Sequence, residues 1–290
     1  MPRLQAARYG KDNIRVYKVE RDEATKTHTV VEMTVCVLLE GEIDVSGRQQ
    51  CSRRHRLNEE HHIHHAKLHS ITPVDQWAAI LGNHFIEKYD HIKIAHITVV
   101  QHRWTRMTVN GQPHPHSFFR DGAEKRVVQA DVSRSGIDIR SGISDLLVLK
   151  STGSEFHHFV RDDFTTLPDV YDRILSTSVD AGWTWKFSSL DEVKQNVAKF
   201  DDTWTKAREI TFRLFALEES PSVQNTMYKM CGEILDAQPL VQTVDYSLPN
   251  KHYFEINLDW HHGLKNTGKD AEVYAPQSDP NGLIKCTVSR

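Results

Sequence analysis

The segment from Gly47 to His65 concentrates side chains that could bind a metal ion. Its histidines offer imidazole nitrogens, and Glu59 and Glu60 could add carboxylate oxygens, a ligand set suited to zinc and similar ions. The spacing matches no ordered zinc motif, and the segment contains no His-Glu-x-x-His helix. It also lacks strand alternation and a convincing helical face, so we expect a solvated polar loop in preference to a dedicated metal site. The histidines are His55, His61, His62, His64 and His65.

Regular elements flank this segment and run, in the first half of the chain, in the order strands, helix, strands. Thr72 is expected to cap a helix that has Pro73 at its first position, because apolar residues follow at helical spacing. Asn110 and Gly111 form a strong hairpin-turn signal. The predicted elements are a long hairpin over Ile14–Val19 and Thr27–Ile43, a helix over Pro73–Tyr89, and strands over Ile92–Val109 and Ser117–Val132.

The second half repeats this rhythm. The sequence predicts a strand over Ile137–Lys150, helices over Leu167–Thr177, Leu190–Phe215 and Val223–Ala237, strands over Val241–Trp260, and an irregular tail over Gly268–Arg290. This order favours an α+β protein with two tandem units, residues 1–136 and 137–290, each an antiparallel sheet covered by helices on one face.

Composition narrows the classes of partner. The formal net charge is −3, with both signs interspersed, so no global basic field exists to hold nucleic acid or an anionic membrane. Apolar runs fall well short of the ~20 residues that span a bilayer, and the first ten residues lack the core of a signal peptide. The four cysteines lie far apart with no Cys-x-x-Cys pair. We therefore expect a soluble, intracellular protein with reduced, mostly structural thiols.

A spaced pattern in the second half resembles the signature of the urate oxidases. The run Leu147–Thr152 is followed at the family's spacings by Phe156, Phe159, Phe164, Leu167 and Arg173. Further matching runs extend through almost the whole chain: Ala7–Asn13, His102–Arg106, His114–Phe118, Leu248–Phe254 and Gln277–Gly282. The resemblance implies two tunnelling-fold (T-fold) domains per subunit, and four subunits that stack into a barrel with active sites at the subunit interfaces.

The same resemblance implies which residues bind urate. Urate is flat and anionic near neutral pH, so an aromatic face and a planar bidentate donor would recognise it. Phe156 and Arg173 match those two positions of the family. Gln224 would donate and accept hydrogen bonds at the opposite edge of the purine, and the backbone amide of Val223 would help to hold a ring carbonyl.

The resemblance assigns the chemistry to a Lys–Thr–His proton relay, of which Lys11 and His252 are two members. Asn250 would hold dioxygen or the incoming water above the ring. The implied reaction is oxidation of urate by O2 and water to 5-hydroxyisourate and hydrogen peroxide, in purine catabolism. Urate supplies the electrons, so no flavin, haem or metal is implied. The family also implies a homotetramer and peroxisomal residence, although the chain ends Cys286–Arg290 without a Ser-Lys-Leu-type signal.

The histidine-rich segment departs from the family pattern. Urate oxidases carry here a Val-Ala-Thr-Asp-Ser run, whose Thr completes the relay and whose Asp backbone helps to bind urate. Neither residue occurs in Gly47–His65. Codons for Val-Ala-Thr-Asp-Ser-Met-Lys-Asn-Thr-Ile-Tyr-Ile, read one base earlier, spell the residues from Arg53 to His64. We therefore interpret the segment as a shifted reading frame, with the missing Thr and Asp codons spanning His55–Leu57, and expect turnover to be impaired in the chain as written.

Two alternatives remain open. The chain could be a degenerate homologue that keeps the fold and the oligomer without turnover; restoring the Val-Ala-Thr-Asp-Ser run would discriminate, since rescued activity indicates a damaged enzyme. It could instead be a metal-dependent T-fold enzyme of pterin or purine chemistry, which metal analysis of the purified protein would reveal. The set Phe156, Arg173 and Gln224 favours urate, because it fits an oxidised purine without requiring a metal.

Overall fold

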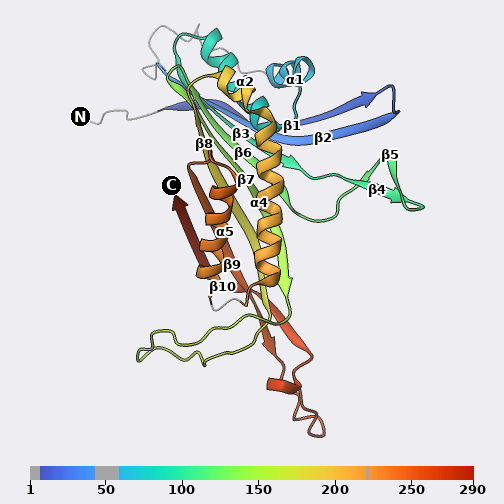
Figure 1. Cartoon of the computed structure of the whole chain (residues 1–290), viewed down its shortest axis with the longest axis vertical. Helices are drawn as coiled ribbons and strands as arrows, with labels where there is room; N and C mark the ends of the chain where they lie inside the picture. Colours follow the sequence, from blue (N-terminus) through green and yellow to red (C-terminus); the bar gives the residue numbers. More distant parts are fainter. Residues whose placement is uncertain (1–6, 43–58, 220–221) are drawn as a thin grey trace.

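The computed structural model describes residues 7–42, 59–219 and 222–290. Within them, eight strands form one antiparallel sheet in the order β1-β2-β3-β6-β7-β8-β9-β10 (Figure 1). These strands are β1 (Arg8–Asp22), β2 (Thr27–Gly41), β3 (Ile92–His102), β6 (Lys125–Ser133), β7 (Gly136–Lys150), β8 (Leu175–Phe187), β9 (Thr243–Glu255) and β10 (Tyr274–Ser289). Two further strands, β4 (Thr105–Val109) and β5 (Gln112–Phe119), pair only with each other.

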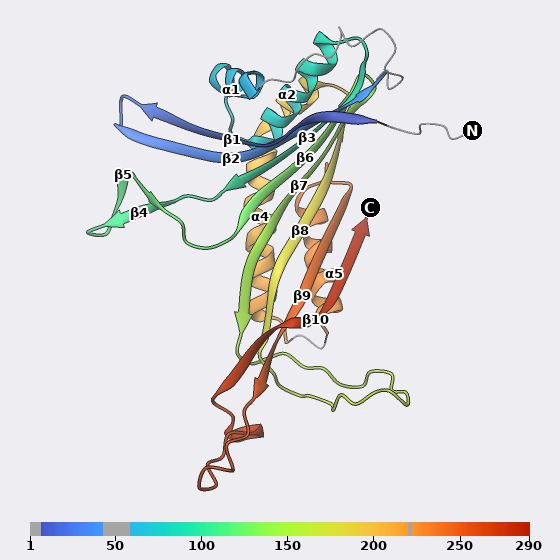
Figure 2. The same cartoon turned by 180° about the vertical axis from the view of Figure 1, so that it is seen from behind.

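The helices gather on one face of this sheet, and Figure 2 shows the opposite face turned toward the viewer. They are α1 (Glu59–Leu68), α2 (Val74–Lys88), α3 (Leu190–Gln195), α4 (Val197–Leu217) and α5 (Val223–Ala237). A 3-10 turn, η2 (Gly268–Asp270), lies in the connection between β9 and β10. α2 packs on β3 and β6, α4 on β7, and α5 on β9 and β10. None of the helices in the described ranges is both long and apolar enough to cross a bilayer.

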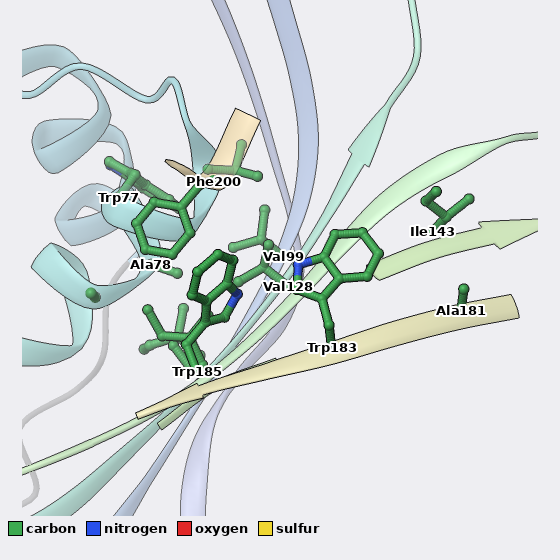
Figure 3. Packing of buried hydrophobic residues seen from close by; sticks show 14 of the residues in the cluster. Trp77, Ala78, Val99, Val128, Ile143, Ala181, Trp183, Trp185 and Phe200 are labelled. Atoms are coloured by element: carbon green, nitrogen blue, oxygen red, sulfur yellow. The ribbon is translucent and has the colours of Figure 1, made fainter. Parts of the chain in front are cut away.

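The core fills the space between the sheet and the helices. In β2 every second residue from Val31 to Leu39 is buried, which is the two-residue period of a strand with one face covered. Figure 3 shows how the large rings from different elements meet, among them Trp77 of α2, Trp185 of β8 and Phe200 of α4. The Trp185 and Phe200 rings lie edge to face with centroids 5.1 Å apart. Each such buried side chain stabilises the fold by roughly 1.5–3 kcal/mol.

Most predicted elements are confirmed. The opening hairpin, the α2 helix, the strand up to Lys150 and the helix Val223–Ala237 all form. The predicted helix over Leu190–Phe215 also forms, divided at Asn196 into α3 and α4. Asn110 and Gly111 both have positive φ angles, 53° and 77°, as a tight hairpin turn requires.

Four local predictions are wrong. Leu167–Thr177 is not helical: the segment before β8 is extended, and the backbones of Phe156 and Val170 exchange two hydrogen bonds of 2.7 and 2.9 Å. The tail is not irregular, because β10 pairs with β9 along its length, with a break in register between Gln277 and Gly282. The sequence did not predict this strand, because the segment is rich in Pro, Asn and Gly. Its backbone hydrogen bonds come from β9, which is a separate segment of the chain.

The other two errors concern the start of α2 and the existence of α1. Thr72 is not the cap of α2; Pro73 itself occupies the N-cap position, with no side-chain cap hydrogen bond. Glu59–Leu68 forms the helix α1 and not a loop. The rest of the predicted polar loop, residues 47–58, lies outside the described residues. The predicted division after residue 136 separates β1, β2, β3 and β6 from β7 to β10, four strands on each side of one continuous sheet.

Candidate active site

The loop between β7 and β8 brings Phe156 and Arg173 together. The Phe156–Val170 bridge closes the loop, and the backbone N–H of Arg173 donates to the Ser154 carbonyl at 3.0 Å. The Arg173 guanidinium carbon lies 5.0 Å from the centre of the Phe156 ring, a cation–π contact. Partial burial lowers the pKa of the Arg173 guanidinium from its usual value. Phe159 also stacks on the Phe156 ring, with centroids 4.7 Å apart. The planar donor and the aromatic ring that an anionic purine needs are thus adjacent, and a stacked ligand would displace one of these two neighbours of Phe156.

The N-terminus of α5 supplies the second part of the site. Ser222 caps the helix, and its hydroxyl accepts a hydrogen bond from the Asn225 N–H at 3.2 Å. Val223 and Gln224 follow in the first turn, where backbone N–H groups have no acceptor within the helix. The Val223 side chain is buried and the Gln224 side chain is exposed. The first turn therefore fixes the backbone at Val223 while the Gln224 amide stays available to a ligand.

Strand β9 supplies the third part. Asn250 pairs in register with Thr177 of β8, and His252, two residues further, pairs with Gln277 of β10. Asn250 and Val223 line a common small pocket of about 20 Å³, which has room for about one water molecule. The other lining residues are Lys150, Leu175, Thr177, Phe215, Thr226, Met230 and Leu248. Six of the seven predicted site residues thus lie on the loop, the α5 N-terminus and β9, toward the lower end of the sheet in Figure 1.

Lys150 and Thr177 also line the pocket, and sequence analysis assigned neither of them a role. The Lys150 ammonium donates to the Glu218 carbonyl at 2.8 Å and lies 5.8 Å from the centre of the Phe215 ring. Burial lowers the pKa of Lys150 from its usual value, opposed by the charges of Glu218 and Asp172. Lys150 belongs to the signature run, so a sequence signal existed. Thr177 carried none, because only strand register places it opposite Asn250.

The seventh predicted residue, Lys11, lies apart from the others. It is an exposed residue of β1, the strand at one edge of the sheet, whereas His252 belongs to β9, next to the opposite edge. Six strand intervals separate β1 from β9, or roughly 29 Å along the sheet at about 4.8 Å for each interval. Within one copy of the chain, Lys11 and His252 cannot share a proton relay.

Helix α1 holds most of the unusual histidines. In the described part of the chain, no group of three or more His, Cys, Asp or Glu side chains is arranged to hold a metal ion. His62 is completely buried, and its ring centroid lies 6.3 Å from that of Phe85. Reading the shifted frame back places Ile both at this buried position and at the exposed His64, so the burial pattern of α1 leaves the frame-shift interpretation a prediction.

Comparison with known proteins agrees with this geometry. The family model described as "Uricase" matches residues 7–131 and 139–285. The chain is 60% identical to the uricase of Emericella nidulans and 59% identical to that of Aspergillus flavus, covering 100% of this chain and 98% of each relative. The chain belongs to the uricase family. The crystal structure of the uricase from Arthrobacter globiformis is 30% identical, with a TM-score of 0.86 over 100% of this chain and 96% of that one.

Membership of the uricase family accounts for the T-fold architecture, in which a large antiparallel sheet is covered by helices on one face. The fold is also shared with the urate oxidase of Bacillus sp. TB-90, with a TM-score of 0.80 at 19% identity. The family match extends through both halves of the chain, so the residues brought together at the lower end of the sheet and the separate Lys11 all lie within it.

Proposed function

We propose that this chain is a urate oxidase, which converts urate, O2 and water to 5-hydroxyisourate and hydrogen peroxide. The observation that carries the proposal is the Phe156–Arg173 pair, placed at the same end of the sheet as the α5 N-terminus and the pocket beside Asn250. Uricase family membership along the whole chain supports it.

Each group has a role in holding the purine. Phe156 stacks on its flat face, while the Arg173 fork binds one edge through paired N–H donors. The first turn of α5 presents the Val223 N–H and the Gln224 amide to the other edge, and the partial positive charge of a helix N-terminus favours an anionic ligand. Asn250 holds dioxygen or water over the ring, because its amide can donate and accept. The electrons come from urate itself.

The proton relay requires two copies of the chain. Lys11 and His252 lie near opposite edges of one sheet, so a Lys11 can reach a His252 only if β1 of one copy approaches β9 and β10 of another. A two-fold arrangement of this kind would close two sheets edge to edge and create two equivalent sites. We propose on this ground that the active sites lie at subunit interfaces, and on the family resemblance that the assembly is a homotetramer located in peroxisomes.

Mixing two inactive variants tests the shared site. In a hybrid of Lys11→Ala and His252→Ala subunits, one interface lacks both residues, whereas the other has Lys11 from one copy and His252 from the other. Co-expression with random pairing should therefore restore about a quarter of the parental turnover, although each variant alone is nearly inactive. Activity of the co-expressed mixture no higher than that of the single variants would refute a relay shared between subunits.

The absence of the family's Thr and Asp determines which version of the chain this test must use. Because the family run is absent from residues 47–65, the chain as written is expected to turn urate over slowly, and the hybrid experiment uses a chain with Val-Ala-Thr-Asp-Ser restored. Urate consumption by ultraviolet absorbance, hydrogen peroxide yield and oligomeric mass should be measured for both chains. Restoration should raise turnover by at least ~10²-fold, as expected when one unit of a relay is replaced. No activity after restoration, with the oligomer intact, would favour a degenerate binding homologue.

A further inference from the structure

Two cysteines that are far apart in the sequence meet between α5 and β10. Cys231 lies in the second half of α5, and α5 packs against β10, which carries Cys286. In β10 the half-buried residues alternate with exposed ones, so Ile284, Cys286 and Val288 all face the core beneath α5. Cys286 is among the groups that raise the pKa of the Cys231 thiol, after burial. The packing of α5 on β10 and this influence both place the two side chains close together.

The pairing of β9 with β10 is separate evidence for where Cys231 and Cys286 lie. The Cys231 thiol donates to the Val244 carbonyl of β9, with sulfur and oxygen 3.7 Å apart. Val244 pairs with Val288, and Tyr246, two residues along β9, pairs with Cys286. Cys231 thus lies over β9 at the level of Val288, which is two residues along β10 from Cys286 and on the same face of the strand. A disulfide requires Cα atoms about 4.4–6.8 Å apart, and both residues lie on elements that pack against each other.

The two thiols differ in access to solvent. Cys231 is completely buried, whereas Cys286 is half-buried on the edge strand. Burial, followed by the charge and hydrogen bond of Cys286, raises the pKa of the Cys231 thiol to about 12. Because Cys286 faces α5 and is the less buried of the two thiols within one copy of the chain, a small oxidant would meet it before Cys231, and Cys231 would act as the resolving thiol.

We propose that Cys231 and Cys286 form an oxidation site that hydrogen peroxide converts to an intrachain disulfide. The Cys286 thiolate attacks peroxide, the O–O bond breaks, and sulfenic acid forms as hydroxide takes up a proton and leaves as water. The Cys231 sulfur then attacks the sulfenic sulfur, so an S–S bond forms, the S–O bond breaks and a second water leaves. Two thiols lose two electrons and two protons, and one peroxide is reduced to two waters.

The site has a direct connection with the proposed active site. Urate oxidation releases one hydrogen peroxide for each turnover, and the inference rests on the proposed function only for this source of oxidant. The disulfide would join α5, which carries Val223 and Gln224, to the β9–β10 pair, which carries Asn250 and His252. Oxidation would hold these binding groups in one fixed arrangement and close a long loop of the chain.

Added peroxide tests the site without relying on urate turnover. The full-length protein is treated with hydrogen peroxide at mildly alkaline pH, alkylated, digested without reductant and mapped by mass spectrometry. We expect a linked peptide pair containing Cys231 and Cys286, two hydrogens lighter than the sum of the two, and a melting temperature higher by roughly 5 °C or more. Dithiothreitol should reverse both changes.

Matched variants distinguish oxidation of Cys231 and Cys286 from oxidation of other residues. In Cys231→Ala the link should be lost, the melting temperature should no longer respond to peroxide, and Cys286 should accumulate as dimedone-trapped sulfenic acid. Cys36→Ala, in which a single thiol on β2 is removed, should keep the link and the shift. Cys286→Ser provides a second variant if Cys231→Ala does not fold. Linkage of Cys286 to a different cysteine would overturn the proposal, as would two intact thiols at a peroxide dose that oxidises the same protein in urea.

Discussion

Removing the Asp75 carboxylate is expected to destabilise the fold strongly. Asp75 lies in the first turn of α2 with its side chain completely buried, and it accepts a hydrogen bond of 2.6 Å from the Arg126 guanidinium of β6. The Ser141 hydroxyl of β7 also donates to it, and accepts in turn from the Trp185 indole N–H at 3.0 Å. This carboxylate therefore connects α2 directly with β6 and β7 and, through Ser141, with β8.

The magnitude follows from the groups that Asp75→Ala would leave without a partner. Breaking a buried ion pair by removing one member costs about 3–5 kcal/mol, and loss of the acceptor for Ser141 adds to that cost. Arg126 keeps a second carboxylate, that of Asp201, whose side chain is half exposed. Because Arg126 keeps this counter-charge, we expect the free energy of unfolding to fall by about 3 kcal/mol, near the lower end of that range.

Urea unfolding followed by circular dichroism would measure the difference in free energy of unfolding. Asp202→Ala is the matched control, because it removes the same group from an exposed pair with Lys206 one helical turn away. That change should alter stability by no more than ~0.5 kcal/mol. A loss below ~1 kcal/mol for Asp75→Ala, or equal losses for both variants, would refute the argument that burial makes this carboxylate indispensable.

Three further predictions concern the site and the histidine helix. In a chain with the family run restored, Arg173→Ala should weaken binding of the analogue xanthine by ~2–4 kcal/mol in calorimetry, and Arg173→Lys should recover little of it; equal affinities would remove Arg173 from the site. In the same chain, Lys11→Ala and His252→Ala should each lower turnover by ~10²-fold or more, and the double variant should be impaired much less than the product of both losses; strictly multiplicative losses would indicate separate steps. Burial, with the neighbouring histidines, lowers the pKa of His65 to about 4. As the pH falls below about 6.5, this histidine therefore becomes protonated in the unfolded chain before it does so in the folded one. The free energy of unfolding should decrease over this range, down to about pH 4. Urea unfolding of His65→Gln should show a shallower decline over that range, and an unchanged slope would contradict the assignment.

Much of the fold was predictable because the signals were local. Val223–Ala237 has apolar residues at helical spacing behind a serine that caps it, and the helix forms over those residues. The opening hairpin and the Asn110–Gly111 turn follow from alternation and from residues that tolerate positive φ angles. The candidate urate-binding residues were predicted from the family resemblance, and the structure brings two of them, Phe156 and Arg173, into contact.

The same local signals failed where hydrogen-bond partners come from elsewhere in the chain. The segment of β10 from Tyr274 to Ser289 reads as a tail, and it becomes a strand only because β9 offers it a free edge. Arg173 was expected on a helix, but the Phe156–Val170 bridge holds its segment extended. Propensity describes the preference of one segment, while pairing depends on backbone groups contributed by another.

By itself, the sequence determined the family, a set of candidate urate-binding residues, and the absence from residues 47–65 of the Thr and Asp that the family pattern carries there. Only the tertiary structure decided which of those residues lie near one another within one copy of the chain. Strand order places Lys11 at one edge of the sheet and His252 beside the other, and it brings Cys231 against Cys286. Spacing along a chain carries no information about which strands become neighbours, because that order is set by pairing and burial over the whole sheet.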